Sequence, residues 1–181
     1  MPLRVENNPM SLAATYGEHK LGDMIEVDMG SFETSKLPMV STGYANCIAI
    51  VGLARRMALL GHFQDISEPG AGGSELFNKA VATLARMEAH DILLAGGGMS
   101  NDPAHIELPT ADRAFAERAV RETLPEAKVT IKWNAHPGTF KDVVVFPESG
   151  RAVIHDNPFR LMGTAEALQF LSQYRSGNID T

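Results

Sequence analysis

Two short aliphatic runs joined by a basic turn constrain the fold of this chain more than any other feature. The runs are IAIVGL at 48–53 and MALLG at 57–61, and Ala54-Arg55-Arg56 separates them. Aliphatic runs of this length around a short polar break predict the two antiparallel strands of a hairpin. The only cysteine, Cys47, precedes the first run, and His62 follows the second. Antiparallel pairing places the thiol and the imidazole at one edge of a sheet. These two groups are the least that cysteine nucleophilic catalysis requires.

The flanking patterns predict a layered α+β domain with a mostly antiparallel, sandwich-like sheet. Apolar or alternating runs indicate further strands at 24–29, 91–95, 128–133, 143–146 and 152–154. Helical periodicity behind a capping residue predicts two flanking helices inserted between strands, at about 74–88 and 110–124, and a C-terminal helix at about 165–174. The stretch between the first two strands, 30–38, is expected to be a loop. Strands that arrive in hairpins argue against a regular βαβ series.

Length and composition indicate one domain. The chain has 181 residues, of which 44% are hydrophobic, enough to bury a sizeable core. Residues 1–22 are polar and interrupted by proline and glycine, which predicts a loosely ordered N-terminal arm. The domain proper is expected over 23–175, followed by a polar tail at 176–181.

Charge and apolar patterning exclude several classes of partner. The net charge is -6 and no basic run occurs, which argues against nucleic acid or an anionic membrane as the main partner. No apolar run approaches the ~18 residues of a membrane span, so no membrane insertion is expected. The N-terminus lacks the basic-then-apolar order of a secretory signal. We therefore expect a cytoplasmic protein, while export as an effector by another route stays open.

Cys47 and His62 each have a plain structural interpretation beside the catalytic one. Free cysteine is among the most buried residue types and often serves as a small core hydrophobe. Here, however, Cys47 follows the loop-like run Gly43-Tyr44-Ala45-Asn46, which places it at a strand edge. Small residues there leave backbone N–H groups able to form an oxyanion hole. Ser41 and Thr42 lie just upstream, placed to orient the imidazole through a hydrogen bond.

Several segments, taken in order, resemble one family of enzymes. The nucleophile segment Val40-Ser41-x-Gly43-x-Ala45-x-Cys47-Ile48-Ala49-Ile50, the hairpin ending in Gly61-His62, the turn Ala95-Gly96-Gly97-Gly98-Met99 and the closing hairpin at 134–153 are similar to the CheD family, the chemoreceptor glutamine deamidases. The resemblance runs from about residue 40 to 154. The same fold and Cys–His pair occur in deamidase toxins of the cytotoxic necrotizing factor and Burkholderia lethal factor types.

The resemblance implies a role for each matching residue. Cys47 would be the nucleophile, His62 the general base and Ser41 the supporting residue. The backbone around Asn46, together with Thr42 and Gly97, would line the oxyanion and substrate site. The implied reaction converts a protein glutamine to glutamate through a thioester, starting from either a neutral or an ion-paired Cys–His couple. The implied substrates are a chemoreceptor, a GTPase or a translation factor, and the role is chemotaxis or that of an effector toxin.

The chain also departs from that family, and other functions stay open. The family usually has Gly-Ser before the cysteine, where this chain has Ala45-Asn46, and a threonine where it has Ser41. These departures leave the substrate open. A thiol amidase or hydrolase acting on a small molecule, and a non-catalytic protein-binding module on the same fold, are the alternatives. The histidines show no metal-ligand spacing and there is one cysteine, so neither a metal site nor a cofactor is expected.

Overall fold

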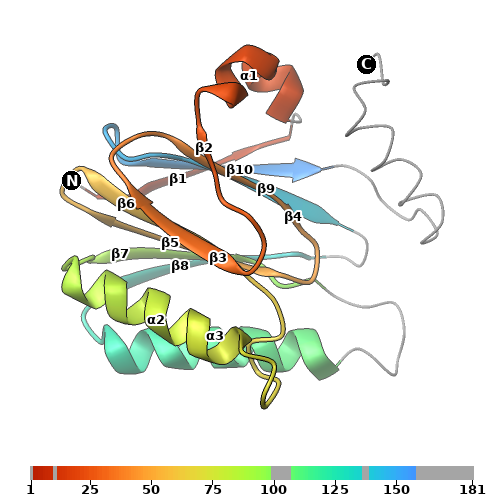
Figure 1. Ribbon diagram of the computed structural model, residues 1–181, viewed down its shortest axis with the longest axis vertical. Coiled ribbons are helices and arrows are strands. Elements are labelled where there is room, and N and C mark those ends of the chain that lie inside the picture. Colours follow the sequence, from red (N-terminus) through yellow and green to blue (C-terminus); the bar gives the residue numbers. More distant parts are fainter. Residues whose placement is uncertain (1, 10–11, 99–106, 136–138, 158–181) are drawn as a thin grey trace.

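The computed structural model describes residues 2–9, 12–98, 107–135 and 139–157 (Figure 1). Within this part of the chain, ten strands form two five-stranded sheets. The first sheet has the order β1 (Arg4–Asn8), β10 (Arg151–Asn157), β9 (Phe140–Phe146), β4 (Met39–Tyr44), β2 (Ile25–Glu26). The second has the order β3 (Ser31–Ser35), β6 (Met57–Phe63), β5 (Ile48–Ala54), β7 (Asp91–Gly96), β8 (Lys128–Trp133).

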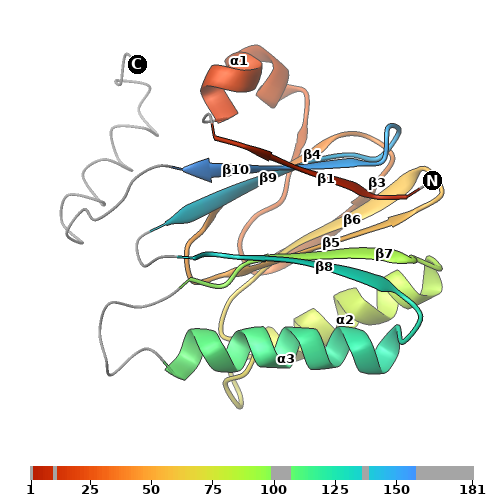
Figure 2. The same cartoon turned by 180° about the vertical axis from the view of Figure 1, so that it is seen from behind.

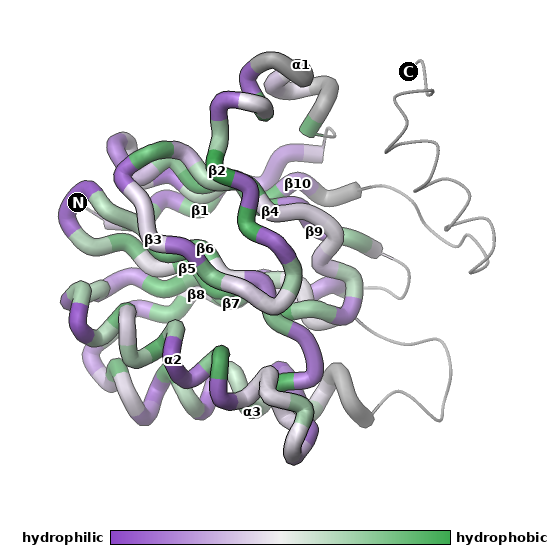
Figure 3. Tube along the Cα trace, in the orientation of Figure 1, coloured by the Kyte–Doolittle hydropathy of each residue, from purple (hydrophilic) through white to green (hydrophobic). Residues whose placement is uncertain are grey.

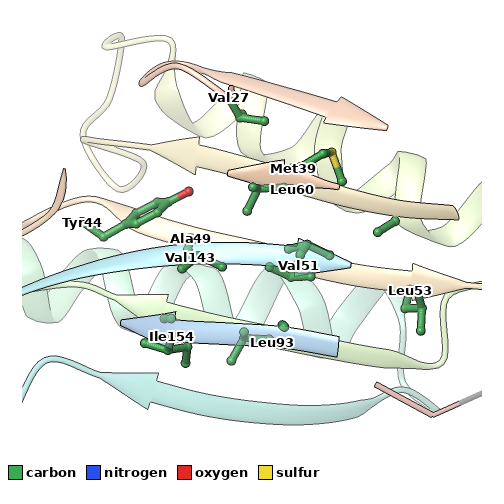
Figure 4. Close-up of a cluster of buried hydrophobic side chains, with 14 of the residues drawn as sticks. Val27, Met39, Tyr44, Ala49, Val51, Leu53, Leu60, Leu93, Val143 and Ile154 are labelled. Atoms are coloured by element: carbon green, nitrogen blue, oxygen red, sulfur yellow. The ribbon is translucent and has the colours of Figure 1, made fainter. Parts of the chain in front are cut away.

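The space between the two sheets is filled by apolar side chains (Figure 4). Strands β5, β6 and β7 contribute one wall and β4, β9 and β10 the other. The residues labelled in the figure are Val27, Met39, Tyr44, Ala49, Val51, Leu53, Leu60, Leu93, Val143 and Ile154. Alternate residues of each strand point into this layer, as strand geometry requires. The strands therefore form a β-sandwich.

Helices cover the outer faces of the sandwich. The helices α2 (Gly73–Arg86) and α3 (Glu107–Thr123) lie together against the outer face of the second sheet (Figures 1 and 2). Along their tube, apolar and polar residues alternate, which is typical of helices with one buried face (Figure 3). The helix α1 (Leu12–Gly22) lies on the opposite side of the molecule, where Leu12 and Tyr16 pack near Val40 and Val144 of the first sheet. The resulting order is helix, sheet, sheet, helix.

The α+β class, the layered architecture and the central hairpin agree with the sequence predictions. β5 and β6 pair antiparallel across a two-residue turn, Arg55-Arg56. The closing hairpin, β9 and β10, forms across residues 147–150. Both inserted helices are present, although α2 begins at Gly73 and its N-cap is Gly72, so Ser74 lies inside the first turn. The predicted helix at 165–174 and tail at 176–181 lie outside the described residues.

Polar edge strands account for most of the differences from the prediction. The expected loop at 30–38 contains β3, and the strand expected at 24–29 shortens to β2. Within the expected loose arm, β1 pairs parallel with β10. Five of the eight strand pairings are antiparallel and three are parallel, so both sheets are mixed. Main-chain hydrogen bonds hold an edge strand without requiring an apolar pattern, so these segments carry no periodic signal.

Candidate active site

The β5–β6 hairpin places Cys47 and His62 on the same, inner face of the second sheet. Ala49 of β5 is the direct partner of His62 in β6. Cys47 lies two residues before Ala49, so the two side chains point to the same face as diagonal cross-strand neighbours. Both are buried: Cys47 is 8% exposed and His62 is 4% exposed. The register of one hairpin is thus enough to bring thiol and imidazole into one neighbourhood.

Ser41 orients the imidazole from the facing sheet. The Ser41 Oγ lies 3.0 Å from His62 Nδ1 and 2.5 Å from the carbonyl oxygen of Val27. A carbonyl only accepts hydrogen bonds, so the hydroxyl must give its proton to Val27. The hydroxyl oxygen then accepts a hydrogen bond from Nδ1–H of His62. This network assigns the neutral imidazole to the Nδ1–H tautomer and leaves the lone pair on Nε2.

Tyr44 forms a second contact with the imidazole. Its ring stacks on that of His62, with centroids 4.0 Å apart and planes 30° from parallel. The phenol is fully buried and donates to the carbonyl oxygen of Gly61 at 3.2 Å. The imidazole is therefore held at Nδ1 by Ser41 and across its face by Tyr44. The sequence interpretation missed this residue because Tyr44 stands three positions after Ser41, a spacing that would put the two on opposite faces of a regular strand.

Burial keeps both candidate reactive groups neutral. It raises the pKa of the Cys47 thiol to about 11, and the charges of Asp65 and Asp112 act in the same direction. Burial also lowers the pKa of His62 to about 4, against a smaller opposing effect of Asp28. At neutral pH the resting pair is thus a thiol and an uncharged imidazole. Of the two starting states that the sequence left open, the surroundings favour the neutral one.

Met29 covers the thiol. Its Sδ lies 3.8 Å from Cys47 Sγ, while the Met29 side chain itself is 57% exposed. His62 Nε2 is buried and has no hydrogen-bond partner among the described residues, Cys47 included. In resting enzymes catalytic hydrogen bonds are often long and tighten only when substrate binds. Met29 thus lies between the thiol and solvent on the side where the two sulfur atoms meet.

A hydrogen-bond network supports the loop at residues 44–47, which leads into Cys47. Asn134, at the end of β8, donates through Nδ2 to the carbonyl oxygens of Tyr44 and Ala45, each at 2.9 Å. The Gly97 N–H donates to the Cys47 carbonyl at 2.8 Å, and Gly96 approaches so closely that a Cβ there would lie 2.4 Å from the same oxygen. These contacts press the 44–47 loop against the end of β7 and hold it in one conformation.

Three further residues were predicted to line the site: Thr42, Asn46 and Gly97. The N–H groups of Asn46 and Cys47 make no loop or turn hydrogen bond to the backbone of another described residue. The Asn46 side chain is exposed, as is that of Thr42, and neither makes a described hydrogen bond with His62. The Gly97 N–H is already engaged by Cys47, and its carbonyl accepts from Arg113. Gly97 thus supports the loop through both backbone groups.

Other kinds of site find little support in the described part of the chain. Its histidine, cysteine and acidic side chains form no group of three that could hold a metal ion. None of its helices is long and apolar enough to cross a membrane. A cavity of about 200 Å³ lies beside the hairpin end, lined by Gly30, Phe63, Gln64, Asp65, Ala71, Gly72, Gly73 and Leu76. Neither Cys47 nor His62 is among its lining residues.

The chain has distant structural similarity to solved proteins. No protein-family model matches the chain, and no curated protein matches it. Among solved structures, it is similar to the C-terminal domain of CNFy from Yersinia pseudotuberculosis, with 10% sequence identity and a TM-score of 0.29. The match covers 65% of this chain and 46% of that one, so the chain spans about half the length of this neighbour.

Proposed function

We propose that the protein is a cysteine-dependent amidohydrolase that deamidates a glutamine side chain of another protein. The observation that carries the proposal is the orientation of His62. Ser41 and the Val27 carbonyl fix the imidazole as the Nδ1–H tautomer and leave a buried, unpartnered Nε2 near the only thiol. A buried polar atom without a partner is costly in a core, and a catalytic role is one physical reason for keeping such an atom. An oriented base beside a nucleophile is the arrangement that acyl-transfer enzymes share.

The first half of the reaction forms a thioester. Nε2 of His62 takes the proton of Cys47 as Sγ attacks the carbon of the substrate carboxamide, so that neither group has to be charged beforehand. The N–H groups of Asn46 and Cys47 would bind the oxyanion that develops on the carboxamide oxygen. The protonated Nε2 then gives its proton to the departing nitrogen. The carbon–nitrogen bond breaks and ammonia leaves.

The second half releases glutamate. Nε2, again unprotonated, takes a proton from water as the water oxygen attacks the thioester carbon. The carbon–sulfur bond breaks, Cys47 Sγ leaves and recovers its proton from the imidazolium, and the product carries a carboxyl group. No external electron donor or acceptor is involved. The low pKa of His62, about 4, keeps the imidazole unprotonated near neutral pH. It also makes Nε2 a weak base, so proton transfer has to be concerted with the attack of Sγ or of water.

A macromolecular substrate fits the surroundings of the thiol better than a free small molecule. Cys47 lies under the exposed side chain of Met29, and neither it nor His62 lines either of the two cavities described. A glutamine side chain presented by a protein surface would enter by pushing Met29 aside. By resemblance, the candidate substrates are a chemoreceptor, a GTPase or a translation factor, and the proposed site of action is the cytoplasm.

The deciding experiment is mass spectrometry of candidate partner proteins incubated with the full chain. Wild type is expected to convert a specific glutamine to glutamate, and the Cys47→Ser and His62→Asn variants are not. The Thr34→Ala variant is a matched control, since Thr34 is exposed on β3 and has no assigned role in the site. If no partner acquires a Cys47-dependent glutamate, the protein-deamidase function is rejected. Turnover of a free amide by wild type alone would support a small-molecule amidase instead.

A further inference from the structure

A β-bulge in β4 brings Ser41 and Tyr44 to the same side of the sheet. Ser41 is opposite Val143 of β9, whereas Tyr44 is opposite Lys141, so two residues of β4 face one residue of β9. Without the extra residue, positions 41 and 44 would point to opposite faces. With it, both side chains are 0% exposed and both contact His62. The geometry of the imidazole therefore depends on the bulge.

Asp142 is the residue opposite the bulge, and it binds the bulge directly. Its Oδ1 accepts a hydrogen bond from the N–H of Gly43 at 2.8 Å. Gly43 has φ +80°, a left-handed conformation that side-chain-bearing residues seldom adopt, so its N–H points away from the regular ladder. A bulge leaves such a group without a ladder partner, and here the carboxylate supplies one. This contact joins β9 to the residue on which the bulge turns.

A carboxyl group is a costly choice at position 142. Asp142 is 6% exposed, and burial raises its pKa to about 6 although the Gly43 N–H acts in the opposite direction. The next residue on the same face of β9, Val144, is a fully buried aliphatic packed under α1. An apolar residue at 142 would avoid the desolvation of a carboxylate but would leave the Gly43 N–H unbound. Asp142 therefore binds the Gly43 N–H, and so fixes the bulge, at the cost of desolvating its own carboxylate.

We propose that Asp142 is a positioning residue of the candidate active site, which acts through the Gly43 bulge to hold Ser41 and Tyr44 against His62. The carboxylate touches neither Cys47 nor the imidazole in any described contact. Its effect passes through the backbone: fixing Gly43 fixes the offset of β4 on β9, and that offset decides which side chains face the imidazole. The role in catalysis rests on the proposed function, whereas the effect on His62 does not.

The test is nitrogen NMR of the His62 ring in the full-length, isotopically labelled protein, with the signal assigned through His62→Asn. In wild type, the two ring nitrogens should report a single Nδ1–H tautomer at neutral pH. In Asp142→Ala, the bulge loses its anchor, and we expect averaging between the two tautomers. Asp142→Asn keeps an Oδ1 acceptor for Gly43 and should restore the single tautomer. Val144→Ala, which makes a cavity on the same face of β9, serves as the control for general destabilisation.

The outcomes separate positioning from plain stabilisation. If Asp142→Ala folds and its His62 keeps one tautomer, or if Val144→Ala causes the same averaging, the positioning role is rejected. If Asp142→Ala does not fold, Gly43→Ala tests the same bulge from the other side, because φ +80° strains any side chain there, and it should show the averaging. Once a substrate is known, Asp142→Ala should lose about tenfold or more in turnover. If Asp142→Ala shows tautomer averaging at His62 but the wild-type protein deamidates no substrate, the positioning role of Asp142 stands and only the proposed reaction is rejected.

Discussion

The Ser41 hydroxyl lies between His62 and Val27, accepting from the Nδ1–H of His62 and donating to the carbonyl of Val27. Its two hydrogen bonds join three segments: β4, β6 and the stretch after β2. Because the hydroxyl proton is committed to a carbonyl, the imidazole has one tautomer available to it. This hydroxyl thus decides which nitrogen of His62 carries the proton and which keeps a free lone pair.

Ser41→Ala should lower both stability and turnover. It leaves the Val27 carbonyl and His62 Nδ1 unpaired in a buried layer, which costs roughly 1–3 kcal/mol of unfolding free energy. Turnover should fall about a hundredfold as the tautomer is released. Chemical denaturation and the mass-spectrometric assay measure the two effects. Ser41→Thr keeps the hydroxyl and should recover most of the turnover; a variant as inactive as Ser41→Ala would show that more than the hydroxyl matters.

Met29→Ala should expose the thiol. Removing the thioether that contacts Cys47 Sγ opens the path to a nucleophile whose reactivity in the resting protein is limited by burial and by a pKa of about 11. Alkylation by iodoacetamide, followed by intact mass, should accelerate several-fold at pH 8. Leu37→Ala is the control, because Leu37 is equally exposed at 61% and lies at the other end of β3. Equal rates in both variants and wild type would contradict the covering role of Met29.

The stability of the protein should depend on pH through His62. Its folded-state pKa of about 4 lies below the usual 6.5, so between these values the unfolded chain takes up a proton that the folded protein refuses. This contribution is complete above pH 6.5 and is lost as pH falls toward 4, by about 3 kcal/mol in all. Asp142 has the opposite tendency, since its raised pKa of about 6 favours the folded state as pH falls through the same range.

Comparison with His62→Asn isolates the histidine from the aspartate. Both proteins keep Asp142, so subtracting their unfolding free energies at each pH removes its contribution. The difference should shrink as pH falls from 6.5 to 4, because only wild type loses the histidine contribution. Urea denaturation of both proteins at a series of pH values measures this difference in unfolding free energy. A difference that stays constant across this range would mean that His62 titrates normally in the folded protein.

Gly96→Ala should disturb the 44–47 loop, in addition to straining the backbone at position 96. Gly96 has φ +84°, and a Cβ there would lie 2.4 Å from the Cys47 carbonyl oxygen. Gly70 has nearly the same φ, +83°, but open space around its Cβ position. Gly70→Ala should therefore lower the unfolding free energy by roughly 1–2 kcal/mol, through backbone strain alone. Gly96→Ala should lower it distinctly more and should also reduce activity. Equal unfolding free energies for the two variants would argue against the close approach.

The sequence was sufficient to predict the features that depend on local pattern. The aliphatic runs and the Arg55-Arg56 turn predicted the hairpin, and the hairpin register put Cys47 and His62 on one face. A hydroxyl from Ser41 or Thr42 was expected near the imidazole, and Ser41 provides it. In each case the relevant spacing lies within about twenty residues.

Features that arise from packing between the sheets could not be predicted in this way. The stacking of Tyr44 depends on a bulge, and a bulge inverts the face assigned to every later residue of the strand. The contact of Met29 with the thiol depends on a segment that was expected to end a strand. Asn134 binds the 44–47 loop although it lies 90 residues after Tyr44 in the sequence. Strand β3 was missed because the polar sequence SFETS has no marked alternation.

The support of the imidazole by residues of the facing sheet has a mechanical consequence. His62 belongs to the sheet that carries the thiol, whereas Ser41 and Tyr44 belong to the facing one, and no covalent link ties the two at that point. The contacts of His62 with Ser41 and Tyr44 therefore depend on how the two sheets of the sandwich are aligned. A sliding of one sheet over the other, too small to expose the core, would already separate the base from its support.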